Sequence, residues 1–252
     1  MAAATVTINW SEIDTLLLDM DGTVLDLAFD NYFWLELVPQ RFAHARGMAY
    51  EAALEEFRAH NERALGTLNW YCIDHWSDQL GLDIATIKHD VRHRIAYLPG
   101  ALPFLRAARD FGLRPIVVTN AHRRTLAIKM RQTHLERHVD AVYSSHDFGH
   151  PKESAQFWRR FESSAGLRRE RCVLIDDSRP VIAAGRAHGL GGTVTITQPD
   201  SSRPRRTVDD GPAVAGLADL AEVLGARRLS CLSREVSGAA GAVCRPRTRT
   251  RS

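Results

Sequence analysis

The sequence of 252 residues has no long hydrophobic run, no paired-cysteine motif and almost no lysine. A membrane-spanning helix needs about 18 consecutive apolar residues, and because no stretch approaches that length, an integral membrane protein is excluded. No signal peptide is visible, since the N-terminus lacks both a basic and an apolar region. The four cysteines are scattered without Cys-x-x-Cys spacing, so we expect a cytoplasmic protein with neither a disulfide framework nor a structural zinc site.

The charge is unevenly distributed along the chain. The 33 basic and 30 acidic residues give a net charge of +3. Residues 229–252 contain five arginines and one acid, a charge of +4, which leaves −1 for residues 1–228. Serine, glycine and arginine dominate this tail, so we predict that it is disordered. A basic tail favours non-specific binding to nucleic acid, but this one lacks aromatic residues for base stacking, so we rank a nucleic-acid-binding protein last among the functions considered.

Short continuous apolar runs alternate with amphipathic stretches over much of the chain. Runs without polar alternation are typical of strands buried on both faces of a parallel sheet. The pattern therefore predicts an α/β fold, a doubly wound, Rossmann-like parallel sheet covered by helices. The expected strands are residues 15–18, 116–118, 172–175 and 193–197, and the expected helices are residues 101–111, 154–165 and 213–224.

Residues 28–97 differ from the rest, because their apolar positions recur at helical spacing and no strand-like run interrupts them. We predict a separate unit of about four helices, inserted after the first strand. Its aromatic residues, including Trp34, Trp70 and Trp76, are expected to form its own core. The predicted organisation is an α/β core of residues 1–27 and 98–228, this helical unit, and the basic tail, 229–252.

The most informative motif is Asp19-Met-Asp21-Gly22-Thr, directly after the first apolar run. In a doubly wound sheet this places two carboxylates at the carboxyl edge of the strands, where ligands bind. Neighbouring acids in a crevice repel each other unless a cation or a shared proton relieves them, and carboxylates suit Mg²⁺. A simple turn after a strand is the alternative interpretation of this motif alone.

Three further elements bring polar groups to the same edge. Thr119 and Asn120 end the second run and offer a hydroxyl and backbone N–H groups to an oxyanion, although both also favour helix N-caps. Asp176 and Asp177 end the third run and either cap a helix or add two acids to a metal site. Lys152, one of only three lysines among the basic residues, opens a predicted helix and would balance the charge of acids and phosphate there.

Together these elements resemble the four motifs of the haloacid dehalogenase superfamily, and the helical unit resembles its C1-type cap. Within that superfamily, the chain resembles the bacterial GMP/IMP nucleotidase family more closely still, over about residues 8–200. The stretches that carry this resemblance are residues 18–34, 68–72 (Leu-Asn-Trp-Tyr-Cys), 119–122 (Thr-Asn-Ala-His) and 149–153 (Gly-His-Pro-Lys-Glu).

The resemblance implies a mechanism for the matched residues. Asp19 would be the nucleophile that forms an aspartyl-phosphate, and Asp21 the general acid and base. Thr119, Asn120 and Lys152 would bind the phosphate, with Thr119 and Lys152 taking part in catalysis. Mg²⁺ would be held by the Asp19 carboxylate, the Asp21 carbonyl and Asp177, with Asp176 behind them or in place of Asp177.

The acid two residues after the nucleophile favours a phosphatase, since relatives that cleave carbon–halogen bonds lack it. A phosphomutase would also keep Asp21, but no feature supports a second transfer. We therefore expect a magnesium-dependent phosphatase of purine nucleoside 5′-monophosphates, with a small-molecule phosphoester as its partner. A phosphatase for a sugar phosphate or a pyrimidine nucleotide is the first alternative.

Weaker signals surround these motifs. Five residues of the helical unit are candidates for reading a purine, namely Asp30, Asn31, Tyr32, Asn69 and Trp70. His122 either contacts the substrate or faces solvent, and Arg123 and Arg124 either attract an anion or are simply solvated. The two i, i+4 histidine pairs, His89/His93 and His134/His138, are expected to be surface residues rather than a metal site.

Overall fold

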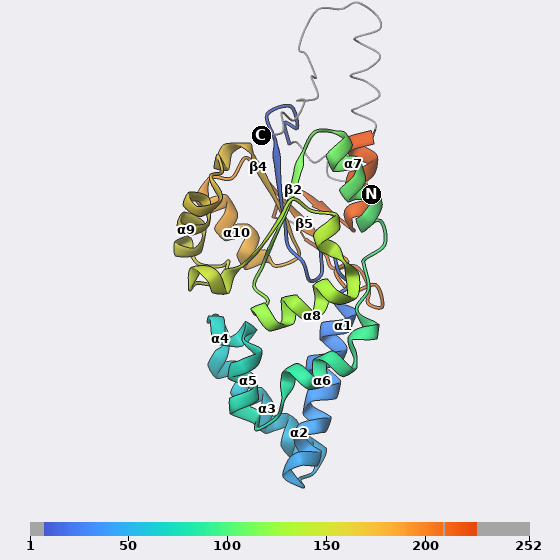
Figure 1. Ribbon diagram of the computed structural model, residues 1–252, viewed down its shortest axis with the longest axis vertical. Helices are drawn as coiled ribbons and strands as arrows, with labels where there is room; N and C mark the ends of the chain where they lie inside the picture. Colours follow the sequence, from blue (N-terminus) through green and yellow to red (C-terminus); the bar gives the residue numbers. More distant parts are fainter. Residues whose placement is uncertain (1–7, 209, 226–252) are drawn as a thin grey trace, which may run out of the picture.

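The computed structural model describes residues 8–208 and 210–225, so the predicted tail, 229–252, lies outside the described residues. The described chain forms a parallel sheet of six strands in the order β3-β2-β1-β4-β5-β6, with helices on both sides (Figure 1). The predicted α/β, doubly wound class is confirmed. The strands are β1 (Thr15–Leu18), β2 (Arg114–Thr119), β3 (Ala141–Ser144), β4 (Cys172–Asp176), β5 (Gly192–Ile196) and β6 (Ala213–Val214).

The order of the strands fixes where a ligand site can form. The chain starts at β1 in the centre, adds β2 and β3 on one side, and then returns to add β4, β5 and β6 on the other side. Leu18 at the end of β1 pairs with Val117 of β2 and with Ile175 of β4. In doubly wound sheets, ligands bind beside the carboxyl ends of the strands at this reversal. The residues that follow β1, β2 and β4 therefore lie together at one edge.

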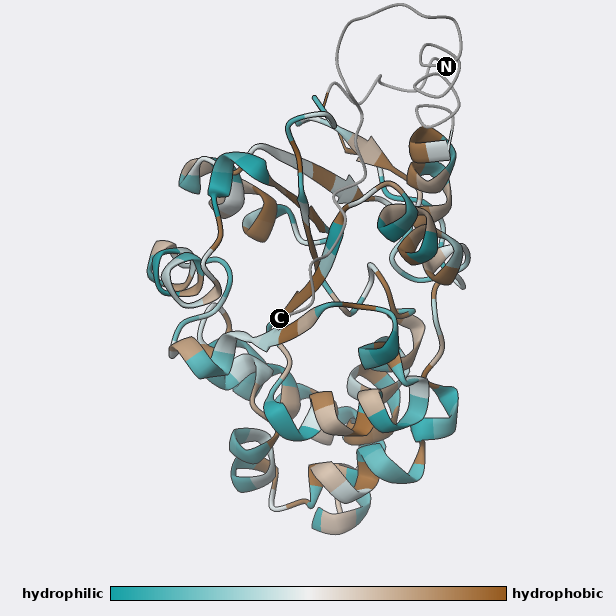
Figure 2. Cartoon of the chain, turned by 45° about the horizontal axis from the view of Figure 1, so that its top comes forward, coloured by the Kyte–Doolittle hydropathy of each residue, from teal (hydrophilic) through white to brown (hydrophobic). Residues whose placement is uncertain are grey.

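Burial on both faces explains the apolar runs of the sequence. Along β1, Leu16 and Leu18 join one apolar cluster with helix α7 (Ala101–Asp110) and the helix at 217–225, whereas Leu17 joins another with α9 (Ala155–Ala165) and α10 (Arg179–His188). Figure 2 shows hydrophobic residues along the central strands, and both hydrophobic and hydrophilic residues on the helices around them. The sheet is thus covered on each side by its own layer.

The helical segment, defined here as residues 28–94, follows β1 and has an apolar cluster of its own. Trp76 is buried in this cluster, and Trp34 and Trp70 pack against it partly buried. The segment consists of α1 (Ala28–Tyr32), a π-helical stretch η1 (Phe33–Leu37), α2 (Val38–Arg46), α3 (Tyr50–Ala64), α4 (Leu68–Tyr71), α5 (Ile73–Leu80), α6 (Ile84–Asp90) and a 3₁₀ turn η2 (Arg92–Arg94). The remaining helices are α8 (Arg123–Thr133) and the 3₁₀ turns η3 (Leu135–Arg137), η4 (Ser145–Phe148) and η5 (Arg169–Arg171).

The sequence patterns missed two strands. Ala141–Ser144 is only partly buried beside β2, so it has no continuous apolar run. The helix expected at 213–224 is wrong at its start, because Ala213 and Val214 pair with β5 and the helix begins at residue 217. No helix in the described ranges is long and apolar enough to span a membrane.

Candidate active site

Asp19 stands where β1 ends, between the ends of β2 and β4. Its backbone N–H still donates to the carbonyl of Ile175 at 2.9 Å, so the ladder with β4 continues to this residue. The chain then turns at Gly22, whose φ of +87° is unfavourable for a side chain. A Cβ at Gly22 would lie 2.8 Å from Cγ of Asp177 and from Cβ of Pro199. Glycine at this position therefore lets the Asp177 carboxylate approach the turn.

The ammonium group of Lys152 lies at the centre of the site. It donates to Asp19 Oδ1, to Asp176 Oδ2 at 2.7 Å and to the carbonyl of Val118 at 2.9 Å. Lys152 and Asp176 are almost completely buried, and the side chain of Asp19 is 10% exposed. Burial acts to lower the pKa of Lys152, but Asp176 and Asp19 outweigh it and raise that pKa above its ordinary value. Lys152 is therefore a permanent cation in contact with two of the predicted site residues.

The backbone of Lys152 is fixed from two sides. Its N–H donates to Asn120 Oδ1 at 2.9 Å, and its carbonyl accepts from Nε1 of Trp158 at 2.7 Å. Thr119 Oγ1 accepts from the N–H of Ala121 at 3.0 Å, which shapes the turn after β2. The side chain of Asn120 thus connects the end of β2 to the loop that carries Lys152. Sequence reasoning did not foresee this contact.

Three carboxylates form a candidate cation site beside Lys152. One oxygen each from Asp19, Asp176 and Asp177 lies within 4.8 Å of the others. Burial raises the pKa of Asp19 to about 7, and Asp176 and Asp21 add to this while Lys152 opposes it. Burial also raises the pKa of Asp176 to about 6 and that of Asp177 to about 7. An all-oxygen donor set whose mutual repulsion is only partly relieved by one lysine fits Mg²⁺.

The two acids that end β4 have different partners. Asp176 uses both oxygens within the protein, one accepting from Lys152 and the other from the N–H of Ser178 at 2.8 Å. Asp177 accepts from Nη1 of Arg206 at 3.2 Å, and the Arg206 side chain is 51% exposed. Asp177 therefore has fewer hydrogen bonds within the protein than Asp176, and it is the better candidate for binding a cation directly.

These pKa shifts predict that the metal-free protein loses stability as pH rises from about 4 to about 7. A carboxyl group whose folded pKa exceeds its unfolded value binds more protons when folded, so its contribution to stability is lost through this range. The pKa of His146, which burial lowers to about 4, opposes the trend but is one group against three. The free energy of unfolding, measured by denaturant titration in chelator at several pH values, should fall, and Asp177→Asn should flatten the decline. An unchanged slope in Asp177→Asn would contradict the assignment of the raised pKa to Asp177.

A second charged network joins Asp21 to the helical segment. Lys129 of α8 donates to Asp21 Oδ1 at 2.6 Å and to Asp30 Oδ2 at 2.5 Å, and Lys88 of α6 donates to Asp30 Oδ1 at 2.8 Å. Burial raises the pKa of Asp21, Lys129 opposes this shift, and the two lysines hold the pKa of Asp30 at about 2 against the effect of burial. All three lysines of the chain are therefore buried against site carboxylates. Sequence reasoning noted that lysine is rare, which was the available signal, but assigned a role to Lys152 alone.

The other candidates in the helical segment occupy varied positions. Asp30 has both oxygens bonded to lysines, Asn31 donates to Asp200 at 2.6 Å, and Tyr32 lies 3.8 Å beneath the guanidinium of Arg94. These contacts tie both carboxylate oxygens of Asp30 to the two buried lysines. Asn69 is exposed on α4, and Trp70 is half-buried and donates to Asn61.

A hydrogen bond near α4 joins the helical segment to the core, and a second one continues from it into the core. Tyr71 donates to Glu153 at 2.5 Å, and Glu153 also accepts from Asn120 at 3.1 Å. These bonds bring α4 over the loops that carry Asn120 and Lys152. Tyr71 and Glu153 lie in two of the stretches that carry the family resemblance, but sequence reasoning assigned no role to either residue.

The three basic residues that follow Ala121 all lie beside aspartates of the protein. His122 does not face solvent, since its side chain is 16% exposed and its Nε2 lies 3.6 Å from Asp74. Arg123 pairs with Asp147, and Arg124 with Asp74 at 2.6 Å. Three members of the two histidine pairs, His89, His93 and His134, are exposed as expected.

Residues 13–189, which include every residue of the four motifs, match the family model of haloacid dehalogenase-like hydrolases. The chain belongs to this family. It is therefore an enzyme, a hydrolase, as the motifs predicted.

Relatives of this hydrolase cover most of its length. The GMP/IMP nucleotidase YrfG of Escherichia coli (strain K12) is 40% identical over 209 residues, which are 83% of this chain and 94% of the relative, and YrfG of Shigella flexneri matches equally well. The crystal structure of a HAD phosphatase from Thermococcus onnurineus matches with a TM-score of 0.70 at 20% identity, covering 84% of this hydrolase and 98% of that chain. At that identity the match shows the shared fold.

Proposed function

We propose that this hydrolase is a magnesium-dependent phosphatase of purine nucleoside 5′-monophosphates such as GMP and IMP. One observation carries the proposal: Lys152 bridges Asp19 and Asp176 next to Asp177, in a chain 40% identical to nucleotidases of that specificity. The scattered cysteines support the cytoplasm as its compartment.

The proposed reaction uses two aspartates in sequence. An oxygen of Asp19 attacks phosphorus, the bond from phosphorus to the ester oxygen breaks, and Asp21 protonates the departing nucleoside oxygen. Asp21, now ionised, takes a proton from water as the water attacks the aspartyl-phosphate, which releases phosphate and restores both carboxyl groups. The raised pKa of Asp21 suits the acid half of this cycle, and Lys129 stabilises the ionised form for the base half.

The remaining residues stabilise charge on the transferring group. Lys152 neutralises Asp19 before attack and the phosphoryl oxygens during it. The Thr119 hydroxyl and the backbone N–H groups near Asn120 bind phosphate oxygens. Asp19, Asp177 and the Asp21 carbonyl would hold Mg²⁺, which supplies further positive charge and orients the phosphate. The bonds that Asp176 makes to Lys152 and Ser178 support a place for it behind these ligands.

A substrate panel tests the proposal. Phosphate release is measured with Mg²⁺ and with chelator for GMP, IMP, pyrimidine nucleotides and sugar phosphates, and substrates are compared by kcat/KM. We expect turnover to require Mg²⁺ and to be highest for the purine nucleotides. Higher kcat/KM for a sugar phosphate or a pyrimidine nucleotide would favour the alternative, a phosphatase for another small phosphoester.

Replacing Lys129 is expected to shift the pH dependence of activity. In Lys129→Met the ammonium that opposes the raised pKa of Asp21 is lost, so this pKa rises further. The basic limb of the kcat/KM profile, where Asp21 loses the proton that it donates to the leaving group, therefore moves to higher pH. Lys88→Met is the matched control, because Lys88 contacts Asp30 but donates no bond to Asp21. Equal shifts in both variants would show that Lys129 acts through general disruption of the network.

Deletion of the basic tail distinguishes the proposed phosphatase from the alternative of a nucleic-acid-binding protein. Deleting residues 229–252 should leave kcat within about twofold, because every site residue lies before the tail and the remaining chain carries a charge of −1. The measurement is phosphate release by the truncated and the full chains, together with salt-dependent binding of duplex DNA. A large loss of kcat would assign the tail a part in the reaction.

A further inference from the structure

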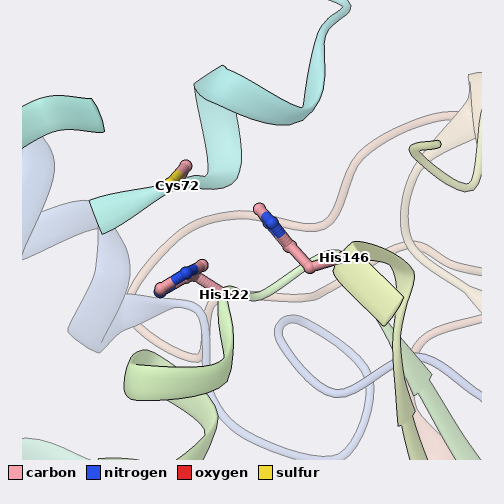
Figure 3. Close-up of side chains that lie close together, drawn as sticks. All are labelled: Cys72, His122 and His146. Carbon is pink, nitrogen blue, oxygen red and sulfur yellow. The ribbon is translucent and has the colours of Figure 1, made fainter. Parts of the chain in front are cut away.

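A second cluster of metal-binding side chains lies where the helical segment meets the core. Cys72 stands between α4 and α5, His122 precedes α8, and His146 belongs to η4. Figure 3 shows that the three side chains lie close together. One ligand atom from each lies within 4.8 Å of the other two. Cys72 and His122 are 50 positions apart in the sequence, and His122 and His146 are 24 apart, so no short sequence motif predicts the cluster.

Both histidine rings have a nitrogen available for a ligand. Nδ1 of His122 and Nε2 of His146 are buried, and neither has a hydrogen-bond partner among the residues that the structure describes. The two rings meet edge to face with centroids 4.9 Å apart. Burial, together with the neighbouring His122, lowers the pKa of His146 to about 4, so its imidazole is neutral at pH 7. A neutral imidazole with an unshared lone pair is the form that binds metal.

Asp74 lies behind one of these rings. Its Oδ2 lies 3.6 Å from Nε2 of His122, while its Oδ1 accepts from Arg124 at 2.6 Å. A carboxylate facing the outer nitrogen of a histidine is the usual support of a metal-bound imidazole. The geometry therefore leaves Nδ1 of His122 as the inward-facing nitrogen.

The chemistry of the donors selects the class of ion. A thiolate and two imidazoles suit zinc and similar transition-metal ions, whereas Mg²⁺ prefers oxygen ligands. Ligand atoms around tetrahedral zinc lie roughly 3.3–3.8 Å apart, given its bond lengths of about 2.0–2.3 Å. Side-chain movements of about 1 Å would bring this cluster into that range. The site is thus chemically distinct from the three carboxylates at the sheet edge.

We propose that Cys72, His122 and His146 form a binding site for a divalent transition-metal ion of the zinc class. Three protein ligands leave a fourth position for water or for an anion. Because Cys72 belongs to the helical segment and both histidines to the core, a bound ion ties the two together beside the turn after β2. Metal binding does not depend on the proposed nucleotidase activity, so the two can be tested separately.

Cobalt is the probe for this site, because thiolate-bound Co²⁺ absorbs in the near ultraviolet and carboxylate-bound Co²⁺ does not. The full-length protein is stripped of metal, reduced, and titrated with Co²⁺ in excess Mg²⁺, which occupies the carboxylate site; Zn²⁺ then displaces the cobalt. We expect a near-ultraviolet band that saturates at one equivalent and disappears on addition of Zn²⁺. Absence of the band would overturn the proposal.

Single variants assign the ligands. Cys72→Ser should abolish the band while keeping the fold, because Cys72 caps α5 by accepting from the N–H of His75 and serine is a good N-cap. His122→Asn and His146→Asn should each weaken binding by at least about 100-fold, and Asp74→Asn by about 10-fold. His89→Asn and Cys172→Ser are controls that should bind as the parent does. A band that persists in Cys72→Ser would place the ion on another thiol and overturn the proposal.

Discussion

Asp19→Asn is expected to lower kcat for phosphate release by about 10⁴-fold or more, because an amide oxygen cannot form the aspartyl-phosphate. Asparagine keeps the size of the side chain, and Lys152 keeps its bond to Asp176. Because burial raises the pKa of Asp19 to about 7, its ionised form is destabilising at neutral pH, so the uncharged amide should not lower the free energy of unfolding there. The measurements are single-turnover phosphate release and mass spectrometry of the acid-quenched protein, in which the parent, but not the variant, gains a phosphoryl group.

Asp78→Asn is the control for this substitution. Asp78 is an exposed aspartate of α5, so its loss should leave kcat within about twofold. If Asp19→Asn retained more than a tenth of the parent activity, Asp19 would not be the nucleophile. If a phosphoryl group appeared on another residue, the two-step reaction would stand with a different acceptor.

Lys152→Met is expected to affect both folding and turnover. It removes the cation between Asp19 and Asp176, and breaking a buried ion pair typically costs about 3–5 kcal/mol. The loss in free energy of unfolding should be larger at pH 8 than at pH 5, because these carboxyl groups, with pKa values of about 7 and 6, are protonated at the lower pH and no longer need the lysine. At saturating Mg²⁺, kcat should fall by about 10²-fold or more, since the phosphoryl oxygens lose their ammonium partner.

Arg131→Met controls for the loss of one positive charge. Arg131 is exposed on α8, so its replacement should change the free energy of unfolding by less than about 0.5 kcal/mol at either pH. Lys152→Arg tests shape as well as charge, because a guanidinium fork does not reproduce the compact geometry of an ammonium. If the loss of stability in Lys152→Met did not depend on pH, the cause would be lost packing. Repulsion between the carboxylates that Lys152 neutralises would then not be the main cause.

Of the three lysines, the sequence predicts a role for one, and the partners of the other two could not be predicted from it. Their rarity was visible in the composition, and the motif order identified Lys152. Lys129 lies 108 residues from Asp21 in the chain, and Lys88 lies 58 residues from Asp30, so no local pattern connects them. Their ion pairs form because α6 and α8 come together over α1, a contact that depends on the packing of the helical segment.

The strands likewise divide into those that the sequence predicts and those that it does not. The run Leu16-Leu17-Leu18 identifies a strand buried on both faces, because its alternate residues enter two different apolar clusters. Ala141–Ser144 was missed because an outer strand is only half covered, and its residues are correspondingly mixed. The edge strand Ala213–Val214 was taken as the start of a helix because two residues are too few to show a period.

The α/β class and the family follow from the sequence alone, as does the prediction that Asp19, Thr119, Lys152 and Asp176 lie at one edge of the sheet. This prediction is possible because parallel strands end at the same side of a sheet, so residues that follow buried runs are neighbours whatever their separation in the chain. Which partners those residues have depends on how the helices pack against the sheet and against one another. The lysine pairing of Asp21 and Asp30, the commitment of Asp176 to Lys152, and the meeting of Cys72 with two histidines all depend on helix packing, which brings side chains together without any fixed spacing in sequence.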